Sequence, residues 1–144
     1  MKNATLRAIG LATFMGMALT TQAAVPPATA AEAATVIPAT SVEIWKAIDT
    51  HLGELRADIA KGALKNVHTH AFVVRDLVRG LPTRSSGLSA DAIANVTAQV
   101  PFVDTLAERL DQTGDANDKA GTEANLAKLE KVLKTIRANY PAAK

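Results

Sequence analysis

Residues 59–64 read IAKGAL, and the glycine in this stretch decides how the chain folds. Before it, apolar residues recur at steps of three and four, which is typical of one face of a helix: Trp45, Ile48, Leu52, Leu55 and Ile59. Continuing this register would put Gly62 and Asn66 on the apolar face, whereas the apolar positions resume out of phase at Leu64. A glycine at such a break is typical of a helix C-terminus. We therefore predict a tight turn at residues 61–62 and a second helix after it.

Three further apolar stripes follow with the same spacing. They consist of Leu64, Val67, Ala71, Val74, Val78 and Leu81; of Ile93, Val96, Val100, Val103, Ala107 and Leu110; and of Leu126, Leu129, Leu133, Ile136 and Tyr140. The stripes predict helices at about residues 41–60, 63–80, 89–112 and 116–140. No alternating β pattern competes with them, and the connections are short. The sequence therefore predicts an all-α fold, an antiparallel up-down-up-down four-helix bundle over residues 40–141.

Local signals mark the ends of these helices. Thr40 followed by Glu43 forms a capping-box pattern at the start of the first helix. Asp115 is a candidate cap for the fourth helix. Pro101 lies inside the third stripe and removes a backbone donor, so we expect that helix to kink or restart there.

The segment before the bundle predicts export. Residues 1–23 have a basic start, an apolar stretch and small residues before the expected cleavage point, which is the pattern of a cleaved signal peptide. Residues 24–39 are rich in Ala, Pro and Thr and predict a flexible linker. The chain has no cysteine, which together with export predicts a periplasmic protein that needs no disulfide. We expect no membrane span after signal cleavage.

Removing residues 1–23 changes the charge of the chain. Lys2 and Arg7 leave, so 16 basic residues become 14 against 14 acidic ones, and the formal charge falls from +2 to zero. A neutral chain gives no electrostatic reason to expect nucleic acid or an anionic membrane as a partner. The 3 methionines leave as well. The mature chain then has no sulfur ligand, which excludes a copper(I) carrier built on soft ligands.

The histidines offer the one lead toward chemistry. Heptad positions place His51 and His70 on matching flanks of the first two helices, nearly level once the chain doubles back. Two imidazoles suit zinc, nickel, cobalt or copper(II). Glu54 follows His51 by three residues and is a candidate third ligand, because zinc normally takes three or four. We therefore predict a divalent transition-metal site at His51, His70 and Glu54.

Other interpretations of these residues stay open. His68 is a weaker candidate ligand, because it points about 200° away from His70 around the helix. We also expect it beside Arg56, whose charge opposes metal binding. Asp58 lies one heptad below His51 on the same flank, and a partner chain is another source of ligands. Alternatively, the histidines are half-exposed polar residues that shield the helix seam.

The sequence contains none of the common catalytic motifs. It has no glycine-rich phosphate loop, no nucleophile elbow, no His-Glu-X-X-His and no Cys-X-X-Cys-His haem attachment. We therefore do not expect an enzyme. In the predicted topology the aromatic residues Trp45 and Tyr140 fall at the same end of the bundle, where we expect them to plug its base.

The closing stretch LKTIRANYP, residues 133–141, resembles the last helix of the periplasmic four-helix b-type cytochromes. The signal peptide, the domain length and the four-helix pattern agree with that family. The resemblance implies a haem held between a methionine on the first helix and a histidine just after the tyrosine of the fourth. Here Pro141 follows Tyr140, and no methionine remains after cleavage. We expect the architecture of that family without its haem.

Two functional hypotheses follow. The first is a periplasmic accessory protein that binds a divalent transition metal as a buffer, a sensor or an efflux helper. The second is a metal-free module that binds a protein partner or another copy of itself. Phe72 and Val73 favour the second, because both lie outside the seam and widen the apolar arc of the second helix. Phe102 or the linker are alternative covers for these two side chains.

Overall fold

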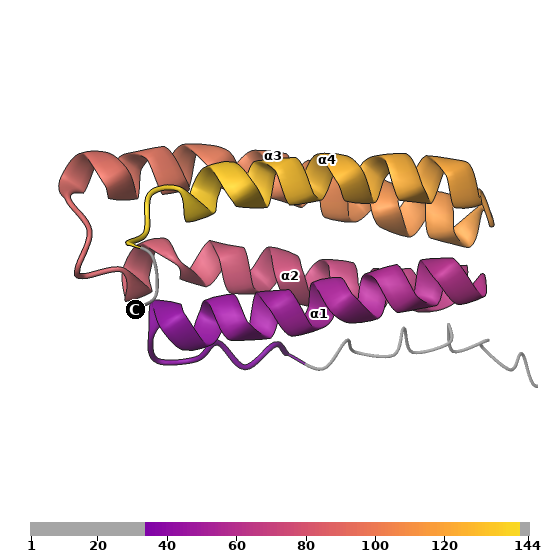
Figure 1. Ribbon diagram of the computed structural model, residues 1–144, viewed down its shortest axis with the longest axis horizontal. Helices are drawn as coiled ribbons and strands as arrows, with labels where there is room; N and C mark the ends of the chain where they lie inside the picture. Colours follow the sequence, from indigo (N-terminus) through magenta and orange to yellow (C-terminus); the bar gives the residue numbers. More distant parts are fainter. Residues whose placement is uncertain (1–33, 142–144) are drawn as a thin grey trace, which may run out of the picture. The chain divides into compact units, whose positions relative to one another are not determined.

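The computed structural model describes residues 34–141 (Figure 1). The predicted signal peptide at residues 1–23 and the first part of the predicted linker lie outside them. Within residues 34–141 the chain is all-helical without a strand, which confirms the predicted all-α class. Its elements are α1 (Ser41–Lys61), η1 (Leu64–Asn66), α2 (Val67–Gly80), η2 (Pro82–Arg84), α3 (Ala90–Asp115) and α4 (Lys119–Arg137), where η marks a short 3₁₀ helix. None of the helices described there has the length and apolar character needed to pass through a bilayer.

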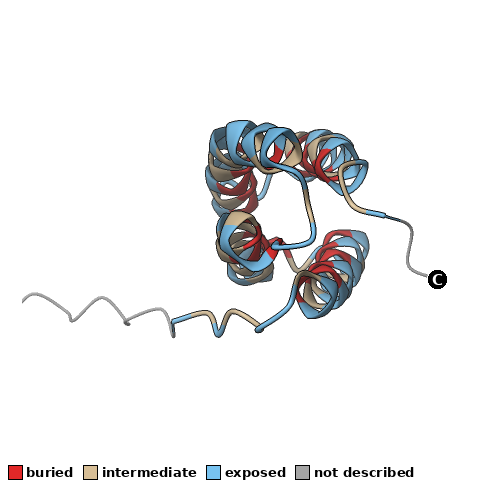
Figure 2. Ribbon diagram, turned by 90° about the vertical axis from the view of Figure 1, so that its left-hand side faces the viewer, coloured by how far each residue is buried: buried red, intermediate tan, exposed pale blue. Residues whose placement is uncertain are grey.

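Each α-helix packs along the next one in the sequence, whereas α1 and α4 touch at only a few points. Apolar residues from all four predicted stripes form one core. Figure 2 shows these buried positions turned toward the neighbouring helices. Fully buried examples are Ile48, Leu55, Val74, Leu110 and Leu129. The helical periodicity of the sequence thus predicted most of the core positions, although Ile93 is not among them and Ile44, Leu77 and Leu106 are buried outside the predicted stripes. Burial of these side chains holds the four helices together.

The chain turns back at Gly62, as the phase break predicts. The α1 helix ends at Lys61, and Gly62 takes a left-handed conformation with a φ of 77°. The N–H of Ala63 donates to the Asp58 carbonyl at 2.8 Å, so the last turn of the helix is closed by the residues that leave it. After this turn, α2 packs along α1.

The second helix begins later than its stripe indicates. Residues 64–66 form the 3₁₀ helix η1, and α2 starts at Val67. The side chain of Leu64 is nevertheless buried, and its carbonyl oxygen lies close to Gly114 of α3. A Cβ atom at position 114 would come within 2.7 Å of that oxygen. The tight contact with α3 therefore accompanies a short, irregular start to the second helix.

The helix ends agree in part with the local signals. At the start of α1, the Thr40 side chain accepts from the Glu43 N–H and the Glu43 carboxylate accepts from the Thr40 N–H, which is the predicted capping box. The predicted cap of the fourth helix is wrong. Asp115 is the last residue of α3, and Asp118 caps α4 by accepting from the Gly121 N–H at 2.9 Å. Both aspartates have the required chemistry, and the length of α3 decides between them.

The α3 helix runs through Pro101 without a break, so of the two expected outcomes, a kink or a restart, the restart does not occur. Proline removes one intrahelical hydrogen bond, but the helix buries residues on both sides of it, among them Val96 and Val103. Packing of this face against the other helices outweighs the loss of a single bond.

The last part of the predicted linker packs against the helices. Ile37 packs against the core, and its side chain occupies the space beside Gly80 where any larger residue would place its Cβ. The Thr35 hydroxyl donates to the Asp76 carboxylate at 3.0 Å. Residues 34–40 therefore form part of the folded unit, attached to α2.

Gly62, which caps α1, and Gly53, which lies inside it, offer a matched test of the turn. We expect Gly62→Ala to destabilise the fold by about 1–2 kcal/mol, because an L side chain strains the left-handed backbone. Gly53→Ala should instead stabilise it by about 0.5–1 kcal/mol, because Gly53 lies inside the helix and a Cβ there meets nothing within 4 Å. Urea denaturation of the two variants measures both effects. Equal effects of the same sign would contradict the assignment of the turn.

Candidate functional site

His51 of α1 and His70 of α2 lie side by side, as their flank positions predict. Their Nδ1 atoms are 2.9 Å apart, and the ring centroids are 5.2 Å apart with 39° between the ring planes. Both side chains are half-buried on the flank of the helix pair. The turn at Gly62 produces this contact, because it sends α2 back along α1 and brings positions nineteen residues apart to the same level.

The contact fixes the protonation of the two rings relative to each other. Two nitrogens at hydrogen-bond distance share one hydrogen, so one Nδ1 donates and the other accepts. Asp58 of α1 bears on this choice, because its Oδ2 lies 3.7 Å from the Nε2 of His70. A carboxylate there favours the hydrogen of neutral His70 on Nε2, which leaves its Nδ1 as the acceptor and makes His51 the donor.

The pKa of His51 is lowered from its ordinary value of 6.5. Burial of the ring is the main cause, the neighbouring His70 adds to it, and Glu54 opposes it. The neutral imidazole is therefore favoured at this position. A neutral imidazole is also the form that binds metal ions.

The other two predicted site residues do not join the pair. Glu54 is exposed on α1, and no group of three or more histidine or carboxylate side chains in residues 34–141 is arranged to hold a metal ion. His68 is turned elsewhere, as expected. Its Nδ1 lies 2.7 Å from the carbonyl oxygen of Lys65, and its Nε2 lies 3.1 Å from the Thr69 hydroxyl.

Arg56, the expected neighbour of His68, faces α4 instead. Arg56 forms an ion pair with Glu130 of α4 at 2.8 Å, and Asp49, on the same side of α1, pairs with Arg137 at 2.7 Å. Heptad reasoning for two helices places both flanks of α1 against α2. In a four-helix arrangement, one flank meets α2 and the other faces α4.

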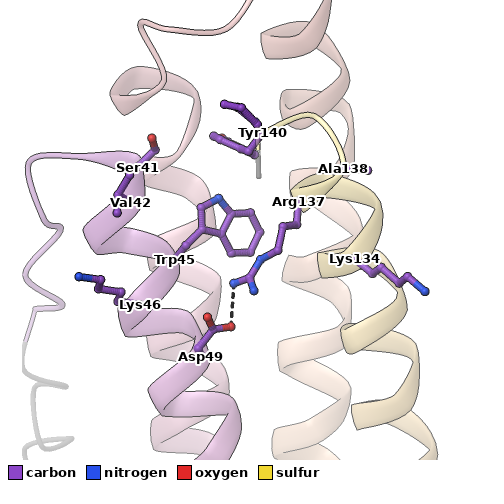
Figure 3. Close-up of a pocket in the computed structure, with 10 residues that line it drawn as sticks. Ser41, Val42, Trp45, Lys46, Asp49, Lys134, Arg137, Ala138 and Tyr140 are labelled. Carbon is purple, nitrogen blue, oxygen red and sulfur yellow. Dashed lines mark hydrogen bonds and ion pairs between the residues drawn. The ribbon is translucent and has the colours of Figure 1, made fainter. Parts of the chain in front are cut away.

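Sequence reasoning missed a groove between the first turns of α1 and the last turns of α4 (Figure 3). Its volume is about 730 Å³. We call it the α1/α4 groove, and it is lined by Ser41, Val42, Trp45, Lys46, Asp49, Lys134, Arg137, Ala138, Tyr140 and Pro141. The predicted aromatic contact lies at this end, with Trp45 and Tyr140 edge-to-face and their ring centroids 5.5 Å apart. The missed signal was a basic residue close to each aromatic residue in the sequence, Lys46 directly after Trp45 and Arg137 three residues before Tyr140.

The cytochrome resemblance implies a haem between the first and fourth helices, which is where this groove lies. Haem iron in such proteins is held by histidine or methionine. No residue of either type lines the groove in the described part of the chain, and Pro141 occupies the position after Tyr140. The donor set of the groove therefore does not fit the axial ligation of that family.

Comparison with known proteins adds no assignment, because the chain matches no protein-family model, no curated protein and no solved structure.

The lowered pKa of His51 makes the stability of the fold depend on pH. The unfolded chain binds a proton at His51 more readily than the folded protein does, so acidification favours unfolding. The stabilising effect is fully present above pH 6.5 and is lost as the pH falls below that value. We expect the thermal unfolding midpoint to fall between about pH 7.5 and pH 5.5, and to fall less in His51→Gln. An equal fall in both proteins, measured by circular dichroism, would contradict this origin.

Proposed function

We propose that this protein binds a divalent transition-metal ion between His51 and His70. The observation that carries the proposal is the 2.9 Å separation of the two Nδ1 atoms. The shared hydrogen of the free pair occupies the position that an ion would take. Binding then requires His51 to lose this proton from Nδ1, either to water or to its own Nε2. The rings must also rotate so that the lone pairs of both Nδ1 atoms point at the ion.

Ligand chemistry favours some ions over others. The 2.9 Å of the free pair is a hydrogen-bond distance, and the rotation that binding requires changes it. For a given set of nitrogen ligands, affinity rises from cobalt through nickel to copper(II) and falls again at zinc. The proposal therefore ranks copper(II) first.

The surroundings of the pair support it as a binding site. Asp58 is positioned near the outer nitrogen of His70, the arrangement in which a carboxylate orients a metal-bound imidazole. The lowered pKa of His51 keeps that ring neutral and available for an ion in mildly acidic solution. With two protein ligands, the ion keeps water molecules in its remaining positions or takes ligands from a second copy of the chain.

The proposal includes the architecture and the location expected from the sequence. Contact between Trp45, near the start of α1, and Tyr140, just after α4, supports an antiparallel up-down-up-down bundle. The signal-peptide pattern of residues 1–23 and the absence of cysteine support export to the periplasm. There the protein would act as a metal buffer, a sensor or an efflux accessory, without catalysis.

The alternative is a metal-free module that binds a protein partner or itself. The wide apolar arc of α2 motivated this alternative. It is less exposed than the sequence indicates, because Phe72 and Val73 are half-buried against the core. The guanidinium of Arg75 lies 4.4 Å from the centre of the Phe72 ring and covers it. Phe102, which is 58% exposed, remains as an apolar side chain on the surface of α3. A single exposed residue of this kind is ordinary in a monomer.

Isothermal titration calorimetry tests the metal proposal. We expect copper(II) to bind the chain from residue 24 onward with a micromolar dissociation constant, and nickel(II) and zinc to bind more weakly. The variants His51→Ala and His70→Ala should each lose at least tenfold in affinity, because one imidazole alone makes a poor site. Binding should also weaken in acid, since protons compete for the same nitrogens.

His68→Ala is the matched control, because it removes a histidine outside the pair and should keep the wild-type affinity. Light scattering during size-exclusion chromatography distinguishes water from a second chain as the source of further ligands. Absence of binding heat, or equal affinity of all variants, would leave the interaction module as the better hypothesis.

A further inference from the structure

The floor of the α1/α4 groove is apolar. Trp45 forms much of it and is itself only 9% exposed, while Val42 at the entrance is 59% exposed. Tyr140 and Pro141 line the groove beyond the end of α4. The volume of about 730 Å³ falls within the usual range for small-molecule sites. A molecule that matches this floor is itself largely apolar.

The residues that line the groove place no free charge against this floor. Arg137 pairs with Asp49 at 2.7 Å, and its guanidinium lies over the Trp45 ring, 4.3 Å from the ring centre. Figure 3 shows the ammonium groups of Lys46 and Lys134 pointing away from the groove, on opposite sides of it. Long side chains of this kind contribute their apolar stems to a surface and keep their charge in water. The groove therefore matches an uncharged molecule better than an anion or a cation.

A buried donor adds an independent observation. The indole N–H of Trp45 is buried and has no hydrogen-bond acceptor in the described part of the chain, which is unfavourable. In Figure 3 this nitrogen lies on the edge of the ring nearest Ser41 and Tyr140, away from the ion pair. The Tyr140 hydroxyl is hydrogen-bonded to Ser85 at 2.7 Å instead. A ligand that brought one acceptor to this end of the groove would satisfy the N–H.

We propose that the α1/α4 groove binds an uncharged, mainly apolar small molecule that carries one hydrogen-bond acceptor, such as an aryl ketone. Its ring would cover Trp45 and Val42, and its acceptor would face the indole N–H at the Tyr140 end. An anion or a cation would lose its hydration there without gaining a partner, because Arg137 and Asp49 already pair with each other. This site is separate from the histidine pair, which faces α2, and the proposal does not depend on metal binding.

The chain contains 1 tryptophan, so its indole N–H gives a single signal in a proton–nitrogen NMR correlation spectrum. Four probes of similar size differ in one group: acetophenone, ethylbenzene, phenylacetate and phenethylammonium. Acetophenone should shift the indole signal saturably. Ethylbenzene should bind about fivefold more weakly because it lacks the acceptor, and the two charged probes at least tenfold more weakly. Equal affinity for all four, or tighter binding of a charged probe, would overturn the proposal.

The Asp49–Arg137 ion pair tests the exclusion of charged ligands. Asp49→Asn leaves the Arg137 guanidinium without its carboxylate, so affinity for phenylacetate should rise at least tenfold while affinity for acetophenone stays within threefold. Glu130→Gln is the matched control, because it frees Arg56 from an ion pair between the same two helices, outside the groove. It should leave the order of the four probes unchanged. No gain in phenylacetate affinity in Asp49→Asn would overturn the proposed selection.

A charge at the entrance tests where the ligand lies. Val42→Glu should weaken acetophenone binding at least threefold, because it replaces an apolar contact with a hydrated carboxylate. Val36→Glu is the matched control, because Val36 is 87% exposed and does not line the groove, and it should bind like the wild type. The helical circular dichroism should stay unchanged in both variants, since both positions are exposed. Equal affinity of the two variants would place the ligand elsewhere and overturn the proposal.

Two further measurements separate competing occupants and sites. A concentration-dependent dimer that acetophenone does not dissociate would mean that a second copy fills the groove, which overturns the proposal. The double variant His51→Ala, His70→Ala should keep full acetophenone affinity. Failure of metal binding with acetophenone binding intact, or the reverse, therefore identifies which of the two proposals is wrong.

Discussion

At Gly62 the backbone takes a left-handed conformation that ends α1 and sends the chain back along it. An unbroken helix through this point would carry His51 and His70 more than about 25 Å apart, at a rise of about 1.5 Å per residue. The turn instead brings their Nδ1 atoms to 2.9 Å. It also sets which flank of α1 faces α2 and which faces α4. The histidine pair and the α1/α4 groove both follow from that division.

The two flanks of α1 have different surroundings. On the α2 side the packing is continuous, so the imidazoles are half-buried and held in contact. On the α4 side the contacts are few, and long side chains bridge the gap through the Arg56–Glu130 and Asp49–Arg137 ion pairs. Exposed pairs of this kind contribute little to stability. The gap between α1 and α4 leaves room beside Trp45 for the α1/α4 groove.

The chemistry at each site follows from an incomplete set of partners. At the histidine pair, two nitrogen lone pairs are available for one hydrogen, so a metal ion and a proton compete for the same position. At the groove, the buried indole N–H of Trp45 lacks an acceptor. Groups of this kind are usually paired inside folded proteins, so sites where they are not are candidates for ligand binding.

The sequence by itself determined the all-α class, the buried stripe of each helix, the turn at Gly62 and the approach of His51 to His70. These features depend on periodicity and on one glycine, which are local properties of the chain. Only the tertiary structure decided that Asp118 rather than Asp115 caps α4, that α3 continues through Pro101, and that Arg56 pairs with α4. The tertiary structure also determined the α1/α4 groove, because the depth of a groove depends on the spacing between two helices that are far apart in the sequence. Local patterns specify which face of a helix is apolar, but not how closely a distant helix covers it.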